Sequence, residues 1–277
     1  MLIFGYKKRF TPTCGYSGEQ VWMKMDREKN LISIIMPSLN EEKSIGKTID
    51  SIPKSELSKL GYRLEIIVVD GDSTDSTREI ATLKGAKVIL EKRKGYGRAY
   101  KTGFRSASDG IIVTLDADGT YPAELIPDYV QELQDKKLDF ITVNRFSHME
   151  RGSMNMLHKI GNRILSIAMR LIYSVNVRDS QSGMWLMRRS FVDAINLSSD
   201  NMSMSEEIKI IAFKFFRATE FDGRYYRRLG KAKLDTFKHG WKNLKYLIEY
   251  RSLLYSCVNV KEEVIAHEFM PQAETKV

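Results

Sequence analysis

The feature of this sequence that most constrains its fold is a regular alternation of short apolar segments with segments of helical pattern. The segment "LISIIMP" at 31–37 is apolar and β-branched and ends in a proline, which predicts a buried strand. "LEIIVVD" at 64–70 and "IIVTLD" at 111–116 are of the same kind. The segments between them carry capping or acidic residues at their starts and apolar residues on one face, as helices do. We therefore predict an α/β fold with a mostly parallel sheet covered on both faces by helices.

The pattern changes after Arg145, where two strongly amphipathic helices are predicted, over Met154–Val175 and Trp241–Ser256. Two interpretations of their apolar faces stay open: packing on the sheet, or contact with a membrane interface. In the first helix, the apolar face consists of Leu157, Ile160, Ile164, Ile167, Ala168 and Leu171, and the basic face of Lys159, Arg163 and Arg170.

Charge and hydropathy restrict the partners and the location of the chain. The formal net charge of +9 favours nucleic acid, phosphorylated substrates or an anionic membrane surface as partners. No apolar run reaches the ~18 residues that a spanning helix needs, and the start lacks the apolar core of a signal peptide. The two cysteines, Cys14 and Cys257, match no metal-ligand spacing. We expect a chain that neither crosses a membrane nor is secreted, in a reducing cytoplasm.

Acidic side chains follow several of the predicted strands. Glu41 follows the predicted strand 31–37, Asp70 and Asp72 lie at and after the end of the strand 64–70, and Asp116 and Asp118 lie at and after the end of the strand 111–116. Ligands of open parallel sheets bind in the crevice at the carboxyl ends of the strands. Two aspartates in an i, i+2 arrangement can present carboxylates to one hard cation. They can equally satisfy backbone groups of the turn that follows, and the local spacing does not decide between the two.

Seven motifs occur together in a characteristic order, from Leu31 to Tyr246. They are "ISIIMPSLNEEKSIGKTIDSI", "EIIVVDGDSTDST", "GYGRAYKTGF", "IIVTLDADGTYP", "NRF", "DSQSGMWLMRR" and "YYRRLGKAKL". This ordered set resembles family 2 glycosyltransferases, and most of all the dolichyl-phosphate mannose and glucose synthase branch. The resemblance implies a GT-A fold, with a Rossmann-like nucleotide-sugar-binding sheet and amphipathic helices on the acceptor side.

The resemblance also implies a domain plan and a set of site residues. An N-terminal extension, 1–30, precedes a glycosyltransferase domain, 31–240, with a nucleotide-sugar half (31–146) and an acceptor half (147–240), and a helix and tail, 241–277, follow. The implied roles are nucleotide-sugar binding by Pro37, Asn40, Glu41, Asp70, Asp72, Gly97, Asp116 and Ala117; Mg²⁺ or Mn²⁺ binding by Asp116 and Asp118; catalysis by Asp118, Arg145 and Arg228; and acceptor-phosphate binding by Arg145, Ser182 and Lys233.

The expected activity is metal-dependent, inverting transfer of a hexose from a nucleotide sugar, of the GDP-mannose or UDP-glucose class, to a polyprenyl or dolichyl phosphate. A phosphate monoester is already largely ionised at neutral pH, so this acceptor needs positioning more than it needs a general base. The acceptor lies in a bilayer, so we expect a peripheral protein at the cytoplasmic face of an anionic membrane, contacted through the amphipathic helices.

Two alternatives stay open. A family 2 enzyme with a saccharide acceptor would need a carboxylate base, for which Glu206 and Glu207 are the only obvious candidates, since Asp179 is expected to be structural. A non-catalytic nucleotide-sugar-binding module is suggested by Thr120, where this branch often has glutamine, and by Ala232, where it usually has serine. No nucleic-acid-binding motif is present, and a homo-oligomer is left open by the sequence.

Overall fold

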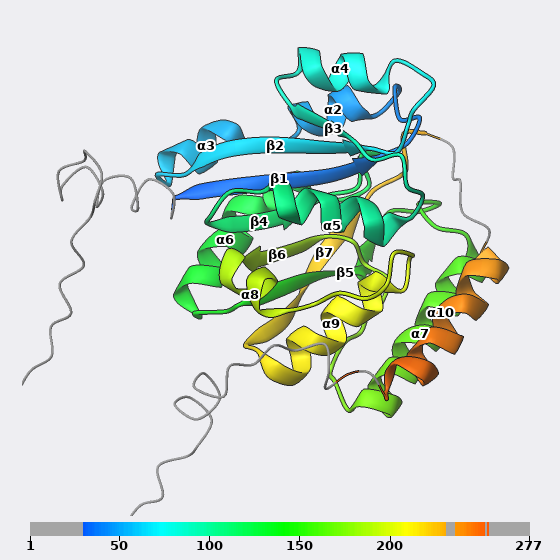
Figure 1. Ribbon diagram of the computed structural model, residues 1–277. Coiled ribbons are helices and arrows are strands. Elements are labelled where there is room, and N and C mark those ends of the chain that lie inside the picture. The colour runs from blue at the N-terminus through cyan, green and yellow to red at the C-terminus, as the bar shows by residue number, and fades with distance from the viewer. Residues whose placement is uncertain (1–29, 231–235, 253, 255–277) are drawn as a thin grey trace, which may run out of the picture.

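The described part of the chain contains a seven-stranded sheet with helices on both of its faces (Figure 1). This computed structural model describes residues 30–230, 236–252 and 254. In spatial order the strands are β3-β2-β1-β4-β6-β5-β7. In chain order they are β1 (Leu31–Ser38), β2 (Arg63–Asp70), β3 (Lys87–Leu90), β4 (Ile111–Thr114), β5 (Phe140–Met149), β6 (Trp185–Arg188) and β7 (Ala218–Tyr225).

The four adjacent strands β3, β2, β1 and β4 are parallel, as the alternation in the sequence predicts. β1 pairs with β2 and with β4, and β2 pairs with β3. In this register Ser38, at the end of β1, lies opposite Asp70, at the end of β2. The carboxyl ends of these strands therefore meet at one edge of the sheet, where the acidic residues of the sequence are located.

Strand β6 is the exception to the parallel arrangement. It runs antiparallel to both of its neighbours, β4 and β5, whereas β5 and β7 are parallel to each other. The sheet is thus mostly parallel, which confirms the predicted α/β class, but the sequence pattern did not predict the reversal. Because β6 is reversed, its first residue, Trp185, lies beside Thr114 at the end of β4. The loop before β6 is thereby placed at the same edge as the residues after β4.

The sheet separates two hydrophobic cores. Ile34 and Met36 of β1 lie in the core with α2 and α6, and Ile35 lies in the core with α5, α7, α9 and α10. Successive residues of a strand point to opposite faces, so an apolar run such as that of β1 supplies both cores. The helices are α2 (Ile45–Asp50), α3 (Lys54–Lys59), α4 (Thr77–Leu83), α5 (Tyr96–Ser106), α6 (Ile126–Asp135), α7 (Met156–Tyr173), α8 (Arg189–Ala194), α9 (Met204–Phe215) and α10 (Thr236–Tyr250), and a short 3₁₀ helix, η1, spans Ala123–Leu125.

Helices α7 and α10 lie side by side (Figure 1) and correspond to the two predicted amphipathic helices. The hydroxyl of Tyr173 in α7 donates a hydrogen bond of 2.6 Å to the carbonyl of Leu247 in α10. Helix α10 begins at Thr236 and not at Trp241, so the predicted start is wrong.

The apolar face that the sequence identifies on α7 does not pack on the sheet. With the exception of Ala168, its residues are 46–78% exposed: Leu157, Ile160, Ile164, Ile167 and Leu171. The helix instead buries a different face, which includes Leu165, Met169 and Tyr173. Packing of the identified face on the sheet is therefore excluded, and α7 presents a stripe of apolar side chains to its surroundings.

Two further expectations concern the extent of the chain. None of the helices in residues 30–230 and 236–252 combines the length and the apolar character that a membrane crossing requires. The proposed extension 1–30 and most of the tail 241–277 lie outside the described residues. Within 31–240, strands from the proposed donor half and the proposed acceptor half pair in one sheet, and the division into halves stays a prediction.

Helix α5 packs so closely on the sheet that one position requires glycine. A Cβ at Gly103 would lie 2.4 Å from the Cγ2 of Ile35, a fully buried residue of β1. We predict that Gly103→Val lowers the free energy of unfolding by about 1–3 kcal/mol, because an overpacked core must shift. The matched control is Gly161→Val in α7, where a Cβ meets no atom within 4 Å and little change is expected. Urea denaturation measures both, and equal stabilities would contradict the close packing.

Candidate active site

Polar side chains gather around Asp70 at the carboxyl ends of β1 and β2, the place where a parallel sheet of this kind has its ligand crevice. This carboxylate is fully buried and accepts hydrogen bonds from the hydroxyl of Ser38 (3.2 Å) and from the backbone N–H of Ser73 (2.9 Å). Arg78 lies 3.6 Å from Asp70 and also 3.6 Å from Asp72, whose side chain is exposed. Of the two aspartates predicted near the base, Asp70 thus shapes the crevice, and Asp72 lies at its rim.

The loop after β1 supplies the other side of this crevice. Pro37 lies within β1, opposite Val69 of β2. Asn40 has a φ of 51°, in the left-handed region that asparagine tolerates better than most residues. Its side-chain oxygen accepts a hydrogen bond of 2.8 Å from the N–H of Thr74, which joins this loop to the one after β2. The predicted nucleotide-contacting residues of these two loops therefore lie together.

Asp118 is a carboxylate whose charge is compensated by the protein. One oxygen accepts hydrogen bonds from the hydroxyl (2.7 Å) and the backbone N–H (3.1 Å) of Thr120, and the other lies 2.8 Å from a guanidinium nitrogen of Arg228. The turn interpretation of this motif is thus correct for one oxygen of Asp118. The hydroxyl of Thr120, which stands where the branch often has glutamine, is used inside the protein to hold Asp118.

Asp116 differs from Asp118 because its described partners are neutral. Its Oδ1 accepts hydrogen bonds from the phenol groups of Tyr96 (3.2 Å) and Tyr100 (3.4 Å), both in α5. Burial, and then repulsion by the charge of Asp118, raise the pKa of Asp116 to about 7, although Arg145 and Arg228 oppose the shift. An ionised Asp116 is therefore short of positive charge, and together with Asp118 it fits the oxygen ligands of a divalent cation.

Arg228 joins distant parts of the sequence at this point. It follows β7, and its guanidinium group contacts Glu41 from the loop after β1 as well as Asp118 from the loop after β4. Its Nε is buried and has no hydrogen-bond partner among the residues that the structure describes. Arg228 therefore reaches the site. Its Nε retains an N–H group that could donate a hydrogen bond to a phosphate oxygen.

Arg145 lies at the site as part of a buried ion pair. Two of its nitrogens donate to the two carboxylate oxygens of Asp179, at 2.7 and 2.8 Å, and its guanidinium group lies 5.4 Å from the ring centroid of Tyr225. Burial raises the pKa of Asp179, but the charge and hydrogen bonds of Arg145 outweigh burial and hold this pKa below its ordinary value. The pair anchors the loop that Asp179 begins, and Asp179 has the structural contacts that the sequence suggested.

The remaining predicted residues differ in their surroundings. Ser182 is fully buried, and its hydroxyl oxygen has no hydrogen-bond partner. Ala117 is buried between the two aspartates. At Gly97 a Cβ would lie 2.7 Å from the carbonyl oxygen of Ser199, so a packing contact requires this glycine, and its predicted contact with the nucleotide stays a prediction. Lys233 lies outside the described residues.

Sequence analysis did not identify the aromatic residues around Asp116. Tyr96 and Tyr100 are four residues apart and so lie on one face of α5. A third tyrosine, Tyr121, accepts a hydrogen bond of 2.6 Å at its hydroxyl from the N–H of Gly183. A Cβ at Gly183 would lie 3.3 Å from Asp116 Oδ1 and even closer to the hydroxyl of Tyr96. The i, i+4 tyrosine spacing was visible in the sequence, but only the folded chain shows that it faces Asp116.

Comparison with known families shows to which family the chain belongs. A sequence model described as glycosyl transferase family 2 matches residues 33–195, which is more than half of the chain. The chain belongs to glycosyltransferase family 2. This confirms the resemblance drawn from the ordered motifs and identifies the protein as a glycosyltransferase.

Several relatives of known name support this membership. The chain is 32% identical to the low-salt glycan biosynthesis hexosyltransferase Agl6 of Haloferax volcanii, over 84% of this chain and 57% of Agl6. It is 30% identical to the dolichyl-phosphate hexose transferase of the same organism, over 76% of this chain and 89% of that one. The dolichol-phosphate mannosyltransferase of Pyrococcus furiosus is 26% identical over 84% of this chain and 65% of that one. The chain thus spans less than two thirds of the length of Agl6 and of the Pyrococcus protein.

Solved structures confirm the GT-A fold. Glucosyl-3-phosphoglycerate synthase from Mycobacterium tuberculosis, in complex with Mn²⁺, uridine diphosphate and glucosyl-3-phosphoglycerate, superposes with a TM-score of 0.65 at 21% identity. The match covers 87% of this chain and 86% of that one. Another structure of this synthase holds Mg²⁺ and uridine diphosphate.

The raised pKa of Asp116 predicts a measurable effect on stability. Between its unfolded pKa of about 3.9 and its folded pKa of about 7, the folded protein binds a proton that the unfolded chain has lost, so this group destabilises the fold increasingly as the pH rises. We predict that Asp116→Asn raises the melting temperature of the metal-free protein more at pH 8 than at pH 5. Asp109→Asn, at an exposed position before β4, is the control. An equal shift at both pH values would contradict the assigned electrostatics.

Proposed function

We propose that this family 2 enzyme is a metal-dependent, inverting glycosyltransferase that moves a hexose from a nucleotide sugar to a polyprenyl phosphate. The observation that carries the proposal is the carboxylate pair after β4, in which Asp118 is compensated by Arg228, whereas the described residues that donate hydrogen bonds to Asp116 are neutral. The names of two relatives, a dolichyl-phosphate hexose transferase and a dolichol-phosphate mannosyltransferase, support this class of acceptor.

Asp116 and Asp118 would hold the Mg²⁺ or Mn²⁺ ion. The described residues contain no group of three or more histidine, cysteine or acidic side chains suited to a metal, so oxygens of the donor diphosphate and water would complete the ligand set. When bound, the metal supplies charge stabilisation for the departing nucleotide diphosphate. The crevice beside Asp70 and Asn40 would take the nucleotide, which would be GDP or UDP.

The cationic residues of the site suit an acceptor phosphate. Arg145 is held in place by Asp179, and Arg228 has an unpartnered Nε, so both can orient phosphate oxygens by charge-assisted hydrogen bonds. The buried hydroxyl of Ser182 is a further donor. An acceptor oxygen would then attack the anomeric carbon in line, and the bond from that carbon to the nucleotide diphosphate would break with inversion.

The two candidate bases for a saccharide acceptor have other contacts. Glu207 is fully buried and accepts hydrogen bonds from the N–H groups of Ser198 (2.7 Å) and Ser199 (2.9 Å). Glu206 is also fully buried, accepts a hydrogen bond of 2.7 Å from Gln181, and has a pKa that burial raises well above its ordinary value. Neither carboxylate is presented to a substrate hydroxyl, which favours an acceptor that needs no base.

A transfer assay tests this proposal. UDP-glucose or GDP-mannose, labelled in the sugar, is offered with Mn²⁺ or Mg²⁺ and a short polyprenyl phosphate in detergent. We expect metal-dependent label in the organic phase, and we expect Asp116→Asn to reduce it by at least about 100-fold because a metal ligand is lost. Asp109→Asn, the exposed control, should retain full activity. Donor hydrolysis alone would point to a saccharide acceptor, and nucleotide binding without turnover to a non-catalytic module.

We further propose that the apolar stripe of α7 lies in the interface of an anionic membrane at the cytoplasmic face. Ile160, Ile164 and Leu171 of this stripe are about half exposed or more, and Trp241 of the neighbouring α10 is 71% exposed. Arg163 and Arg170 flank the stripe and are also exposed, as in helices that bind headgroups and acyl chains together. This contact would bring a lipid-linked acceptor to the protein.

Vesicle binding tests this contact. The double variant Ile164→Asp/Leu171→Asp should bind vesicles of phosphatidylcholine and phosphatidylglycerol at least about tenfold more weakly, because it loses apolar area and adds negative charge. Leu83→Asp, at an 85% exposed position in α4, is the control and should bind like the unsubstituted protein. Unchanged vesicle binding together with a lower molar mass in solution would contradict the proposal and indicate that the stripe binds a second copy of the chain.

A further inference from the structure

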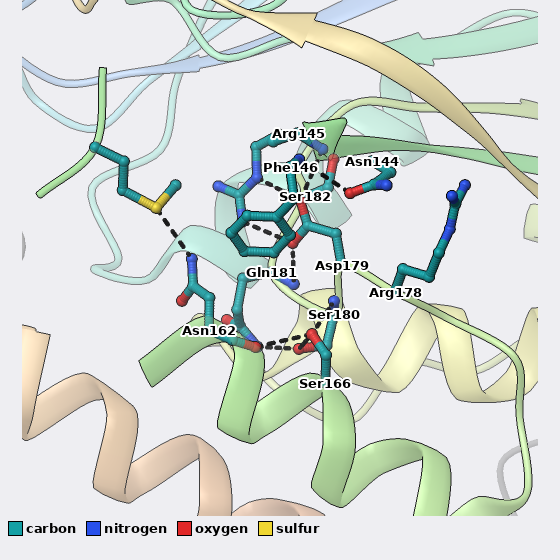
Figure 2. Close-up of polar contacts among 12 residues, drawn as sticks. Asn144, Arg145, Phe146, Asn162, Ser166, Arg178, Asp179, Ser180, Gln181 and Ser182 are labelled. Atoms are coloured by element: carbon teal, nitrogen blue, oxygen red, sulfur yellow. Dashed lines mark hydrogen bonds and ion pairs between the residues drawn. The ribbon is translucent and has the colours of Figure 1, made fainter. Parts of the chain in front are cut away.

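The loop Asp179–Gly183, which precedes β6, is held between the site and the outer helices. Figure 2 shows Arg145 on one side of Asp179 and Ser166 of α7 on the other side of the loop. The N–H of Ser180 donates a hydrogen bond of 2.9 Å to the hydroxyl of Ser166. From α10, the amide of Asn243 donates one of 2.9 Å to Gln181. These contacts fix the beginning of the loop but not its last peptide, between Ser182 and Gly183.

Lys209 of α9 contacts this loop through its side-chain nitrogen. The side chain is fully buried, and its ammonium nitrogen donates hydrogen bonds to the carbonyl oxygens of Ser180 (2.8 Å) and Ser182 (2.7 Å) and to the hydroxyl of Ser205 (3.0 Å). An ammonium group has three donors, so the nitrogen is satisfied by these three oxygens. Two of the three belong to the loop, so Lys209 joins α9 to it, together with Ser205, whose hydroxyl lies 3.1 Å and 3.0 Å from the same two carbonyl oxygens.

The Ser182–Gly183 peptide connects Lys209 to the carboxylate pair. Besides the hydrogen bond from Lys209, its carbonyl accepts one from the indole of Trp185 (2.8 Å) and one from the hydroxyl of Ser205 (3.0 Å). Its N–H points the other way and donates to Tyr121, and the Cβ position of Gly183 is 3.3 Å from Asp116 Oδ1. A rotation of this peptide would thus move the backbone against Asp116 and would move the Ser182 hydroxyl at the same time.

We propose that Lys209 is a positioning residue, whose side-chain nitrogen fixes the Ser182–Gly183 peptide so that Ser182 and Asp116 keep their places for acceptor and metal. The assignment of those two roles rests on the proposed function, whereas the contacts of Lys209 do not. Lys209 acts through the loop and does not touch a substrate.

The cost of burying Lys209 supports a role that a hydrophobic side chain would not fill. Burial lowers the pKa of Lys209 to about 7; the charges of Asp179, Glu220 and Glu206 oppose this shift, and that of Arg145 adds to it. A buried ammonium loses hydration that only well-placed oxygens offset. Methionine would fill the same space without this penalty, but it could not hold two carbonyl groups.

The variant Lys209→Met tests the proposal in the full chain. We expect faster amide hydrogen exchange in the segment 180–185, a higher KM for the polyprenyl phosphate and a kcat/KM for it that is about tenfold to a hundredfold lower. Binding of the nucleotide sugar in the absence of a divalent metal should change less than about threefold, because the residues around Asp70 belong to other loops. The matched control is Lys214→Met, an exposed lysine of the same helix, which should change none of these quantities.

A second control separates positioning from loss of stability. Leu133→Ala, in the core on the opposite face of the sheet, removes a fully buried side chain and lowers stability without touching the loop. It should leave the acceptor KM of the folded protein unchanged.

Unaltered exchange at 180–185 in Lys209→Met, or an acceptor KM that stays the same while kcat falls with the folded fraction, would overturn the proposal. If the unsubstituted enzyme transfers no sugar to a polyprenyl phosphate, the proposed function fails, and hydrogen exchange alone decides the role of Lys209.

Discussion

The proximity of two carboxylates at the end of β4 is the constraint on which the rest of the site depends. Two such charges repel each other, and burial makes the repulsion stronger. The protein compensates Asp118 with Arg228 and with the donors of Thr120, whereas the hydrogen-bond donors to Asp116 among the described residues are the phenol groups of Tyr96 and Tyr100. The negative charge of the site is therefore only partly compensated by these described residues, and a divalent cation with a diphosphate would restore the balance of charge.

The reversed strand β6 explains how distant segments reach these carboxylates. A parallel strand in this place would put the preceding loop at the opposite edge of the sheet. Because β6 is antiparallel to β4, the loop Asp179–Gly183 lies beside Asp116 and carries the partner of Arg145. Lys209, Ser166 and the outer helices support the same loop. This loop therefore connects the site with α7, the helix that carries the apolar stripe.

The parts that the sequence predicted are those that depend on local pattern. The apolar runs of β1, β2 and β4 indicated buried parallel strands, and the rule for parallel sheets placed Asp70 and Asp116 at one edge. The direction of β6 depends on which neighbours it pairs with, which its four residues do not encode. The sequence pattern also could not predict which face of α7 is exposed, because that helix is apolar on two faces and packing decides which one is buried. The contact of Gly97 with Ser199 joins residues about a hundred positions apart, so spacing in the sequence could not suggest it.

The central claim is that the protein supplies two metal ligands at this site and that a nucleotide diphosphate supplies most of the others. Calorimetric titration of Mn²⁺ tests this claim directly, first into the protein alone and then in the presence of UDP or GDP. The account predicts weak binding of the metal alone and binding at least about tenfold tighter with one of the two nucleotides, since the diphosphate completes the ligand set. Equal affinity for Mn²⁺ with and without both nucleotides, or unchanged binding in Asp116→Asn, would contradict it.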